Sequence, residues 1–169
     1  MSYLLYAVAA IIGLISIVLV IGTVLPVKHV ASKTINLKAS NAQVWRLMTD
    51  YKNAANWRTD LVKATAETND ENIEIIYEYE NEKSFMAFET LEEIGQQKLV
   101  RRIYGKNLPF GGTWTFELQK TDVGTRLTIT ENGEVYNILF RFVAKSIMGH
   151  DATILNYIKD IEQAVAKDL

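Results

Sequence analysis

The residues whose types and positions allow chemistry are two carboxylates and one arginine of an adjacent pair. Glu131 continues the inward side of a predicted strand on which Leu127 and Ile129 alternate, so regular alternation places its carboxylate inside the protein. Burial raises the pKa of a carboxyl group and makes it a candidate acid–base residue. Arg101 or Arg102 is the candidate partner, and only one of these neighbours can face inward. If the strand ends or bulges at Glu131, the carboxylate is instead solvated.

A second polar pair, His150 and Asp151, lies where Gly149 interrupts the pattern of the last predicted helix. Asp151 falls on the apolar stripe of that helix, where it can orient a ligand or transfer a proton. Asp is also a favoured N-cap residue, so a helix that starts after a kink explains it equally well. No pairing of a nucleophile with a base accompanies Asp151 or Glu131, so both are acid–base candidates without an assigned reaction.

Aromatic side chains on predicted strands form the candidate wall of a ligand cavity. Inward strand positions are where aromatic residues usually pack, so a plain hydrophobic core is the simpler explanation of them. The candidate ligand-binding set combines these aromatic residues with the polar ones: Trp57, Tyr77, Tyr79, Arg102, Trp114, Phe116, Glu131 and Asp151.

Several other chemistries find no support in the chain. It has two histidines and no cysteine, so there is no zinc-ligand spacing, and we expect neither a metal nor a cofactor. Gly111-Gly112 precedes a strand instead of opening a helix, so it is a turn and not a phosphate loop. The net charge of −2 provides no electrostatic basis for binding nucleic acid.

The elements that must position these residues follow a clear order: strand, two helices, roughly six strands and a long helix. We expect the first strand over Val30–Lys38, and Ser40-Asn41-Ala42-Gln43 then matches a capping box that starts a helix. A second short helix is expected from Asp50 to Trp57. The final helix is expected from an apolar stripe: Phe140, Val143, Ile147, Ile154, Ile158, Ile161 and Val165.

The strands after Leu61 are predicted from alternation and short turns. Ile73, Ile75, Tyr77 and Tyr79 alternate with acidic residues, which is typical of a half-buried strand. Links this short favour antiparallel hairpins. A curved sheet with an apolar concave face needs the last helix as its cover.

Four segments in this order resemble one superfamily, the SRPBCC superfamily, which groups START lipid-transfer domains, birch-type pollen allergens and polyketide cyclase/dehydrase-like proteins. The resemblance covers about residues 30–168 and rests on segments in and between the predicted elements: Ala39-Ser40 with Val44-Trp45, Tyr51 with Trp57-Arg58, Arg102-Ile103 with Leu108–Trp114, and Thr130–Val135. It implies an α+β helix-grip fold, in which a curved antiparallel sheet of about seven strands surrounds a long C-terminal helix. It also implies an apolar cavity for lipids, sterols, quinones or polyketides, in which some members catalyse cyclisation or dehydration and many only carry a ligand.

Residues 1–27 contain no charged side chain, and Leu4–Val24 is almost entirely apolar. At about 1.5 Å per residue this helix spans roughly 30 Å, the thickness of the hydrocarbon core of a bilayer. We therefore expect a transmembrane anchor over residues 1–27 and a separate domain over residues 28–169. A cleaved signal peptide normally has a basic start and a shorter apolar run, and a buried core helix normally has a polar face.

The basic flank of this helix predicts its orientation. Lys28, Lys33 and Lys38 follow the apolar segment and no basic residue precedes it, which places the domain on the cytoplasmic side of a single-pass protein. Further along, Ile138–Met148 carries Arg141 and Lys145 on one face. It can rest on an anionic membrane surface or form the first part of the last helix.

These features lead to one functional hypothesis and two alternatives. The first is membrane-tethered binding of a hydrophobic small molecule, a lipid, quinone or polyketide-like compound, so the expected partners are that molecule and the bilayer. The second is a cyclase or dehydratase that uses acid–base residues of the cavity. The third is an interaction module with a closed core and no ligand.

Overall fold

The computed structural model describes residues 2–145, 149 and 151–167. Its centre is one antiparallel sheet of seven strands in the order β1-β7-β6-β5-β4-β3-β2. The strands are β1 (Lys28–Leu37), β2 (Lys63–Thr68), β3 (Glu74–Tyr79), β4 (Phe85–Ile94), β5 (Lys98–Ile103), β6 (Phe110–Thr121) and β7 (Gly124–Val135). The helices are α1 (Ser2–Val24), α2 (Asn41–Thr49), the 3₁₀ helix η1 (Tyr51–Asn56), α3 (Ile138–Val143) and α4 (Ala152–Lys167).

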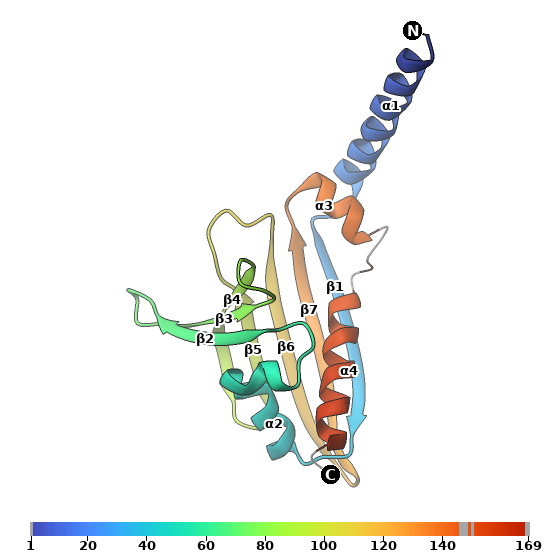
Figure 1. Ribbon diagram of the computed structural model, residues 1–169. Coiled ribbons are helices and arrows are strands. Elements are labelled where there is room, and N and C mark those ends of the chain that lie inside the picture. Colours follow the sequence, from blue (N-terminus) through green and yellow to red (C-terminus); the bar gives the residue numbers. More distant parts are fainter. Residues whose placement is uncertain (1, 146–148, 150, 168–169) are drawn as a thin grey trace.

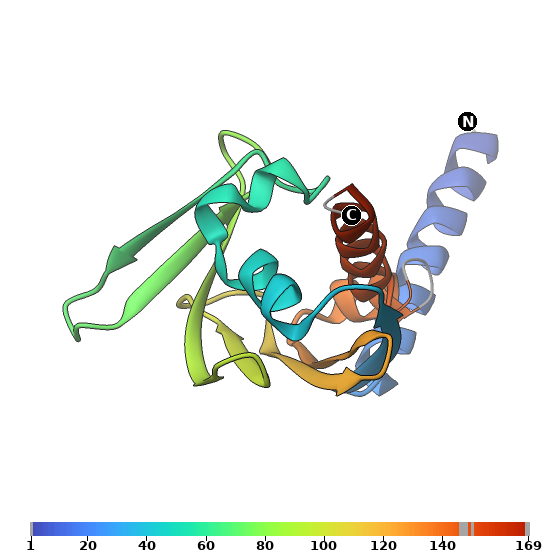
Figure 2. The same ribbon diagram turned by 90° about the horizontal axis from the view of Figure 1, so that it is seen from below.

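The sheet curves around α4, while α2 and η1 pack beside that helix on the same side (Figures 1 and 2). This arrangement confirms the predicted helix-grip fold. The capping box of α2 is present, because Gln43 N donates to Ser40 Oγ at 3.3 Å and Ser40 N donates to Gln43 Oε1 at 2.9 Å. The expected second helix is the 3₁₀ helix η1, and the expected last helix is divided into α3 and α4.

The division leaves part of the expected stripe without a structural description. Ile147 and His150, together with the end of the Ile138–Met148 segment, lie outside the described residues. Phe140 is half exposed on α3, whereas the four stripe residues of α4 are buried against the sheet. Those four are Ile154, Ile158, Ile161 and Val165.

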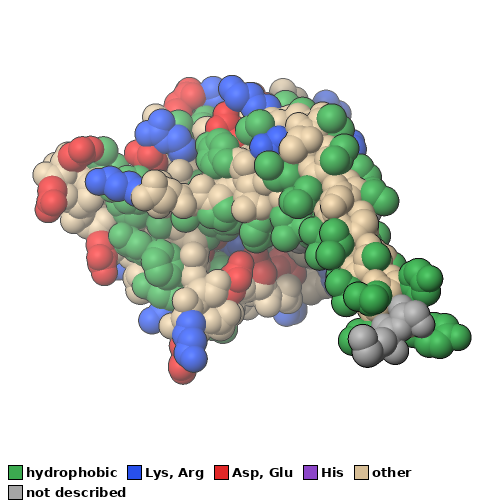
Figure 3. All heavy atoms as spheres, turned by 90° about the horizontal axis from the view of Figure 1, so that it is seen from above, with side chains coloured by type: hydrophobic (Ala, Val, Ile, Leu, Met, Phe, Trp, Pro, Cys, Tyr) green, Lys and Arg blue, Asp and Glu red, His purple; other side chains and the backbone are tan. Residues whose placement is uncertain are grey.

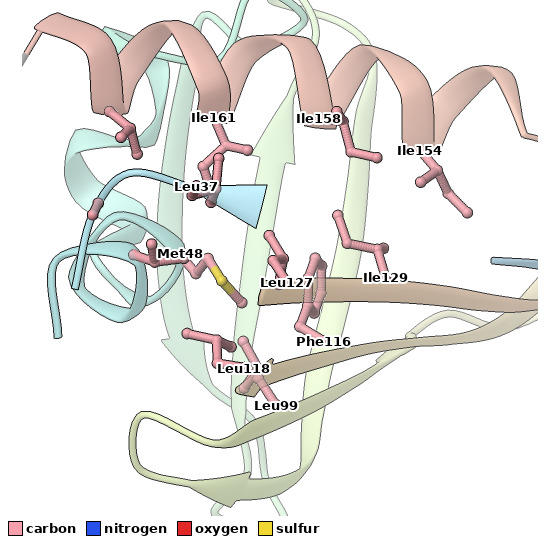
Figure 4. Close-up of a cluster of buried hydrophobic side chains, with 13 residues drawn as sticks. Leu37, Met48, Leu99, Phe116, Leu118, Leu127, Ile129, Ile154, Ile158 and Ile161 are labelled. Atoms are coloured by element: carbon pink, nitrogen blue, oxygen red, sulfur yellow. The ribbon is translucent and has the colours of Figure 1, made fainter. Parts of the chain in front are cut away.

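The hydrophobic core fills the space between α4, α2 and the half of the sheet farther from α1 (Figures 1 and 4). Leu127, Ile129, Ile154 and Ile161 are fully buried in it. Phe116, Leu118 and Leu99 extend the core across β6 and β5. These buried side chains fill this half of the grip, so it is a packed core. The burial of each large one stabilises the fold by about 1.5–3 kcal/mol.

The buried carboxylate of Asp160 holds η1 to α4. Thr59, which follows η1, donates its backbone N–H to Asp160 at 2.7 Å and its hydroxyl at 2.9 Å. Asp160 is 2% exposed, so these contacts compensate for the loss of its hydration.

Helix α1 projects away from the sheet, and its surface is hydrophobic (Figures 1 and 3). Residues 3–24 form one helix that is long and apolar enough to cross a membrane, and its large apolar side chains are almost all exposed, while Gly22 is buried. The alternative of a core helix is therefore wrong for this segment. Length and composition alone fit both a membrane anchor and a signal sequence.

Candidate functional site

A small cleft of about 50 Å³ lies between the sheet and α4, next to the hydrophobic core. Its lining combines aromatic rings with charged groups from the segment after η1, four strands and α4: Arg58, Glu78, Phe88, Arg101, Trp114, Phe116 and Tyr157. Cross-strand pairing explains why the strand residues meet, since Arg101 is opposite Trp114 and Leu99 is opposite Phe116. Residues that are directly opposite each other in neighbouring strands share a face of the sheet.

Glu78 joins the two arginines of the cleft. Arg58 Nη1 lies 2.7 Å from Glu78 Oε2, and Arg101 Nη1 lies 3.6 Å from Glu78 Oε1. Arg58 also forms an ion pair with Asp60 at 2.7 Å. Burial lowers the pKa of the Arg58 guanidinium, but the Glu78 and Asp60 carboxylates outweigh burial and hold that pKa above its ordinary value. The charges of the cluster therefore compensate one another.

Arg101 keeps hydrogen-bonding capacity that the surrounding protein does not use. Its Nη2 donates to the carbonyl of Met48 at 3.4 Å. Its Nε is buried and has no hydrogen-bond partner within the part of the chain that the structure describes. A buried donor without a partner is costly, so an oxygen acceptor in the cleft would stabilise this group.

Tyr157 is the aromatic centre of the cleft. Its ring lies 5.4 Å from the rings of Trp57 and Phe116 and 6.3 Å from that of Trp114, and the Arg58 guanidinium lies 5.2 Å from it. Burial raises the pKa of the Tyr157 hydroxyl to about 12, although the two arginines oppose this rise. The hydroxyl is therefore neutral at pH 7 and can donate or accept a hydrogen bond.

Glu131 lies on the same concave face as the cleft, nearer to α1. Its side chain is 18% exposed, and His29 Nε2 approaches Glu131 Oε1 at 3.6 Å. Glu131 Oε2 is buried without a hydrogen-bond partner among the described residues. Burial raises the pKa of Glu131 to about 7. The His29 ring lies so close to Gly133 that a side chain at this glycine would collide with it.

The inward orientation that alternation predicted for Glu131 is confirmed, but neither arginine is its partner. Trp114 is opposite Arg101 on β5 and opposite Glu131 on β7, so it lies between them. Two strand spacings separate the backbones of Arg101 and Glu131 by about 10 Å. The site therefore consists of a charged cleft and a separate carboxylate, with Trp114 between the two.

Three residues predicted for the cavity lie on the outer face of the sheet. Tyr77 and Tyr79 each pack against Phe85 with ring centroids 5.5 Å apart. The guanidinium of Arg102 is 53% exposed and pairs with Glu89 at 2.7 Å. Glu78 faces inward instead of its tyrosine neighbours because two arginines compensate its charge. Alternation identified the strand correctly and assigned its faces the wrong way round.

The other predicted residues divide between the cleft and its surroundings. Trp114 and Phe116 line the cleft, and Trp57 contacts it through Tyr157. Asp151 instead forms an ion pair with Lys33 at 2.8 Å. It directly precedes α4, and its carbonyl accepts from Leu155 N at 2.9 Å, which is the position of an N-cap residue.

Sequence reasoning missed Arg58, Glu78, Phe88 and Tyr157 as lining residues, and His29 beside Glu131. A signal for Tyr157 was available, because it follows Ile154 by three residues and so lies on the inward side of the last helix. Glu78 carried no such signal, since it belongs to a run of acidic residues that resembles a solvated face.

Comparisons with known proteins agree with this geometry. The family model described as polyketide cyclase / dehydrase and lipid transport matches residues 28–154. A search of curated protein sequences finds no match to this chain.

Solved structures with the same fold have little sequence identity to this chain. The aromatase/cyclase Zhui from Streptomyces is 8% identical with a TM-score of 0.62, and the match covers 83% of this chain and 94% of Zhui. A START superfamily protein from Mycobacterium smegmatis is 14% identical with a TM-score of 0.61, covering 83% and 99% of the two chains. The di-domain aromatase/cyclase StfQ of the steffimycin biosynthetic pathway is 10% identical with a TM-score of 0.63; the match covers 84% of this chain but only 51% of StfQ. The fold is shared with a START superfamily protein, and the family match, which covers most of the chain, shows that this chain belongs to the polyketide cyclase / dehydrase and lipid transport family.

Proposed function

We propose that this chain is a membrane-tethered protein that binds a hydrophobic small molecule and holds one of its oxygen atoms in the cleft. The observation that carries the proposal is the buried Arg101 Nε, a donor that finds no acceptor among the described residues, in a cleft with aromatic walls. A quinone, a polyketide-like compound or a lipid combines apolar surface with carbonyl or hydroxyl oxygens that can accept this hydrogen bond.

The size of the cleft limits how such a molecule binds. Pockets that enclose a drug-sized ligand usually measure about 300–1,000 Å³. The cleft of about 50 Å³ admits one small polar group or part of one ring. The remainder of the ligand lies outside it, or α4 and η1 move apart to receive it. The Asp160–Thr59 contact joins these two elements and is the interaction that such a movement would break.

In this proposal residues 1–27 are the membrane anchor and residues 28–169 are the binding domain. The support for the anchor is the length and apolar surface of α1. Only Leu25, Pro26 and Val27 separate α1 from β1, so the domain stays close to the bilayer. A short tether favours pickup of membrane-soluble molecules over transport through the cytoplasm.

The test is mass spectrometry of the full chain, solubilised in detergent and measured both intact and after solvent extraction. We expect a co-purifying apolar compound in the wild type. Arg101→Gln should retain at least tenfold less of it, because the cleft then lacks its unused donor. Arg102→Gln, the adjacent change on the outer face, should retain it at the wild-type level.

Two results would contradict ligand binding in the cleft. Equal retention by the Arg101 and Arg102 variants would place the ligand elsewhere. A wild-type chain that carries no compound, and gains none when incubated with quinones or phospholipids, would favour the alternative of an interaction module. The filled core around Ile129 and Ile154 supports that alternative.

A second candidate function, catalysis of a cyclisation or dehydration, has the support of Glu131. A carboxyl group with a pKa of about 7 can donate and accept protons near neutral pH. The aromatase/cyclases StfQ and Zhui share the fold, which makes this reaction class the natural one to test. Incubation of the co-purified compound with wild type and with Glu131→Gln should give product only with the wild type. If Glu131→Gln and Asp151→Asn both turn over the compound at the wild-type rate, the acid–base hypothesis is wrong.

A further inference from the structure

Helix α3 is attached to the last turn of α1 (Figure 1). Arg141 Nη1 donates to the carbonyls of Gly22 at 3.3 Å and Leu25 at 3.2 Å. In a continuous helix the Gly22 carbonyl would accept from the backbone nitrogen of residue 26, but Pro26 has no N–H. Arg141 supplies the missing donor, and its positive charge suits the C-terminal end of a helix.

Close packing reinforces this attachment. Gly22 contacts Ile138 of α3 so closely that any side chain at the glycine would overlap the Ile138 backbone. Arg141 Nη2 also donates to the Tyr136 carbonyl at 3.1 Å, which joins the α1 contact to the end of β7. Isolated helices of six residues are unstable in water, so the position of α3 depends on these contacts.

The other side of α3 presents large apolar side chains to solvent. Leu139 is 52% exposed, Phe140 is 50% exposed, and Tyr136 just before the helix is 50% exposed. Aromatic and leucine side chains of this kind are typical of the boundary between headgroups and acyl chains. Exposed Lys145 follows α3, as exposed Lys28 follows α1, so each apolar segment ends in a cation at the expected level of the headgroups.

We propose that α3 is a second membrane contact, in which Leu139 and Phe140 insert into the bilayer interface beside the end of α1. This inference rests on the proposed anchoring by α1, because the attachment through Gly22 and Arg141 sets the depth of α3. The structure favours the bilayer as the occupant of this surface, since the apolar surface of α3 is continuous with that of the anchor. Two contacts restrict the tilt of the domain, whereas a single helix followed by a short link leaves the domain free to rotate.

The experiment uses the absence of cysteine from the natural chain, so that one introduced cysteine is the only site for a spin label. The full chain is placed in nanodiscs of phosphatidylcholine and phosphatidylglycerol, with the label at Phe140→Cys, Leu14→Cys or Thr153→Cys. Accessibility to oxygen and to a water-soluble nickel chelate is then measured by power saturation. We expect oxygen to dominate at positions 14 and 140 and nickel to dominate at position 153, which is exposed on α4.

The three labels distinguish failure of the inference from failure of the anchor. A nickel-dominated signal at position 140 with an oxygen-dominated signal at position 14 overturns the role of α3 and leaves the anchor intact. A nickel-dominated signal at position 14 overturns the anchor itself. Exclusion of both reagents at position 140 means that protein covers α3, and it overturns membrane contact in favour of a second copy of the chain.

Two further variants keep the test independent of the labelled phenylalanine. Leu139→Cys should report the same oxygen-dominated accessibility if labelling at Phe140 disturbs folding. Arg141→Gln, added to Phe140→Cys, should shift the label toward nickel accessibility, because the attachment to Gly22 and Leu25 is lost. Arg126→Gln, an exposed arginine on β7, should leave the label unchanged. An unchanged label in the Arg141 variant would overturn the positioning role of this arginine.

Discussion

Glu78 and Glu131 point from the sheet toward its concave side, and the protein stabilises them in different ways. Glu78 lies between two guanidinium groups, so its burial is compensated by ion pairs. Within the described part of the chain, Glu131 forms its ion pair with His29 at 3.6 Å, and one of its oxygens has no hydrogen-bond partner there. Burial without compensation favours the neutral carboxyl form, which is why the raised pKa belongs to Glu131.

This difference makes the stability of the domain dependent on pH through Glu131. Its pKa is 4.5 when unperturbed and about 7 in the folded protein, so the folded state binds more protons between these values. Stability is therefore lost as the pH rises through this window. Glu131→Gln should leave the free energy of unfolding unchanged below pH 4.5 and raise it by up to about 3 kcal/mol at pH 8. This value follows because one pKa unit corresponds to about 1.4 kcal/mol. Urea unfolding in detergent, followed by tryptophan fluorescence, measures the free energy of unfolding at each pH.

The control for this prediction is Glu162→Gln, at an exposed position of α4. It should change the free energy of unfolding by less than about 0.5 kcal/mol at any pH between 5 and 8. Parallel pH profiles for the wild type and Glu131→Gln would mean that the Glu131 carboxyl is solvated.

At the scale of elements, polar side chains on two helices hold neighbouring segments in place. Asp160 on α4 accepts from Thr59 and so holds the segment after η1, which carries Trp57 and Arg58, against the cleft. Arg141 on α3 holds the end of α1 by donating to the carbonyls of Gly22 and Leu25. In both cases a charged side chain satisfies backbone groups that the local secondary structure leaves without partners.

Loss of the first of these contacts should destabilise the domain strongly. Asp160→Ala removes the acceptor of the Thr59 backbone N–H and hydroxyl, and hydrogen bonds to a charged group contribute about 1.5–3 kcal/mol each. We expect the free energy of unfolding to fall by about 3 kcal/mol and amide exchange to increase in residues 51–60. Urea unfolding and hydrogen–deuterium exchange provide the two measurements.

Lys159→Ala is the matched control, because this neighbour of Asp160 is exposed on α4. Its unfolding midpoint and its exchange in residues 51–60 should equal those of the wild type. If Asp160→Ala unfolds at the wild-type urea concentration, the Asp160–Thr59 contact does not hold η1.

At the scale of the whole molecule, α1 and the hydrophobic core lie at opposite ends of the domain. The base of α1, α3 and the start of β1 lie together at one end, and the filled core lies at the other (Figure 1). The cleft and Glu131 lie on the concave face beside the core. With α1 as the proposed anchor, a membrane-soluble ligand would approach from the α1 end of the domain.

The orientation of the whole molecule across a bilayer is testable with introduced cysteines. Lys28, Lys33 and Lys38 follow the apolar helix, and positive residues next to a span stay on the cytoplasmic side. In intact cells a membrane-impermeant maleimide should label Ser2→Cys and should label Thr153→Cys only after permeabilisation. The reverse pattern would contradict a cytoplasmic domain. A mature chain whose mass lacks the first helix would identify that helix as a signal sequence.

The sequence alone determined the order and type of the elements and the family, because these depend on local patterns. The capping box at Ser40 starts α2, alternation marks the strands, and the apolar stripe of Ile154, Ile158 and Ile161 marks α4. Each of these signals is contained within a few consecutive residues. The helix-grip fold follows once these elements are assembled in their sequence order.

Only the tertiary structure decided which polar groups meet. Glu78 faces inward because Arg58 and Arg101, which are distant in sequence, compensate its charge, and this reversed the expected faces of β3. Glu131 lies inward as its strand's alternation predicted, yet its neighbour is His29 on β1 and not an arginine. Strand alternation specifies two faces but not which one is buried, and the partner of a buried charge depends on contacts between distant segments. Glu131 was therefore visible in the sequence as a candidate, whereas the cluster of Glu78 with two arginines and the His29 contact were not.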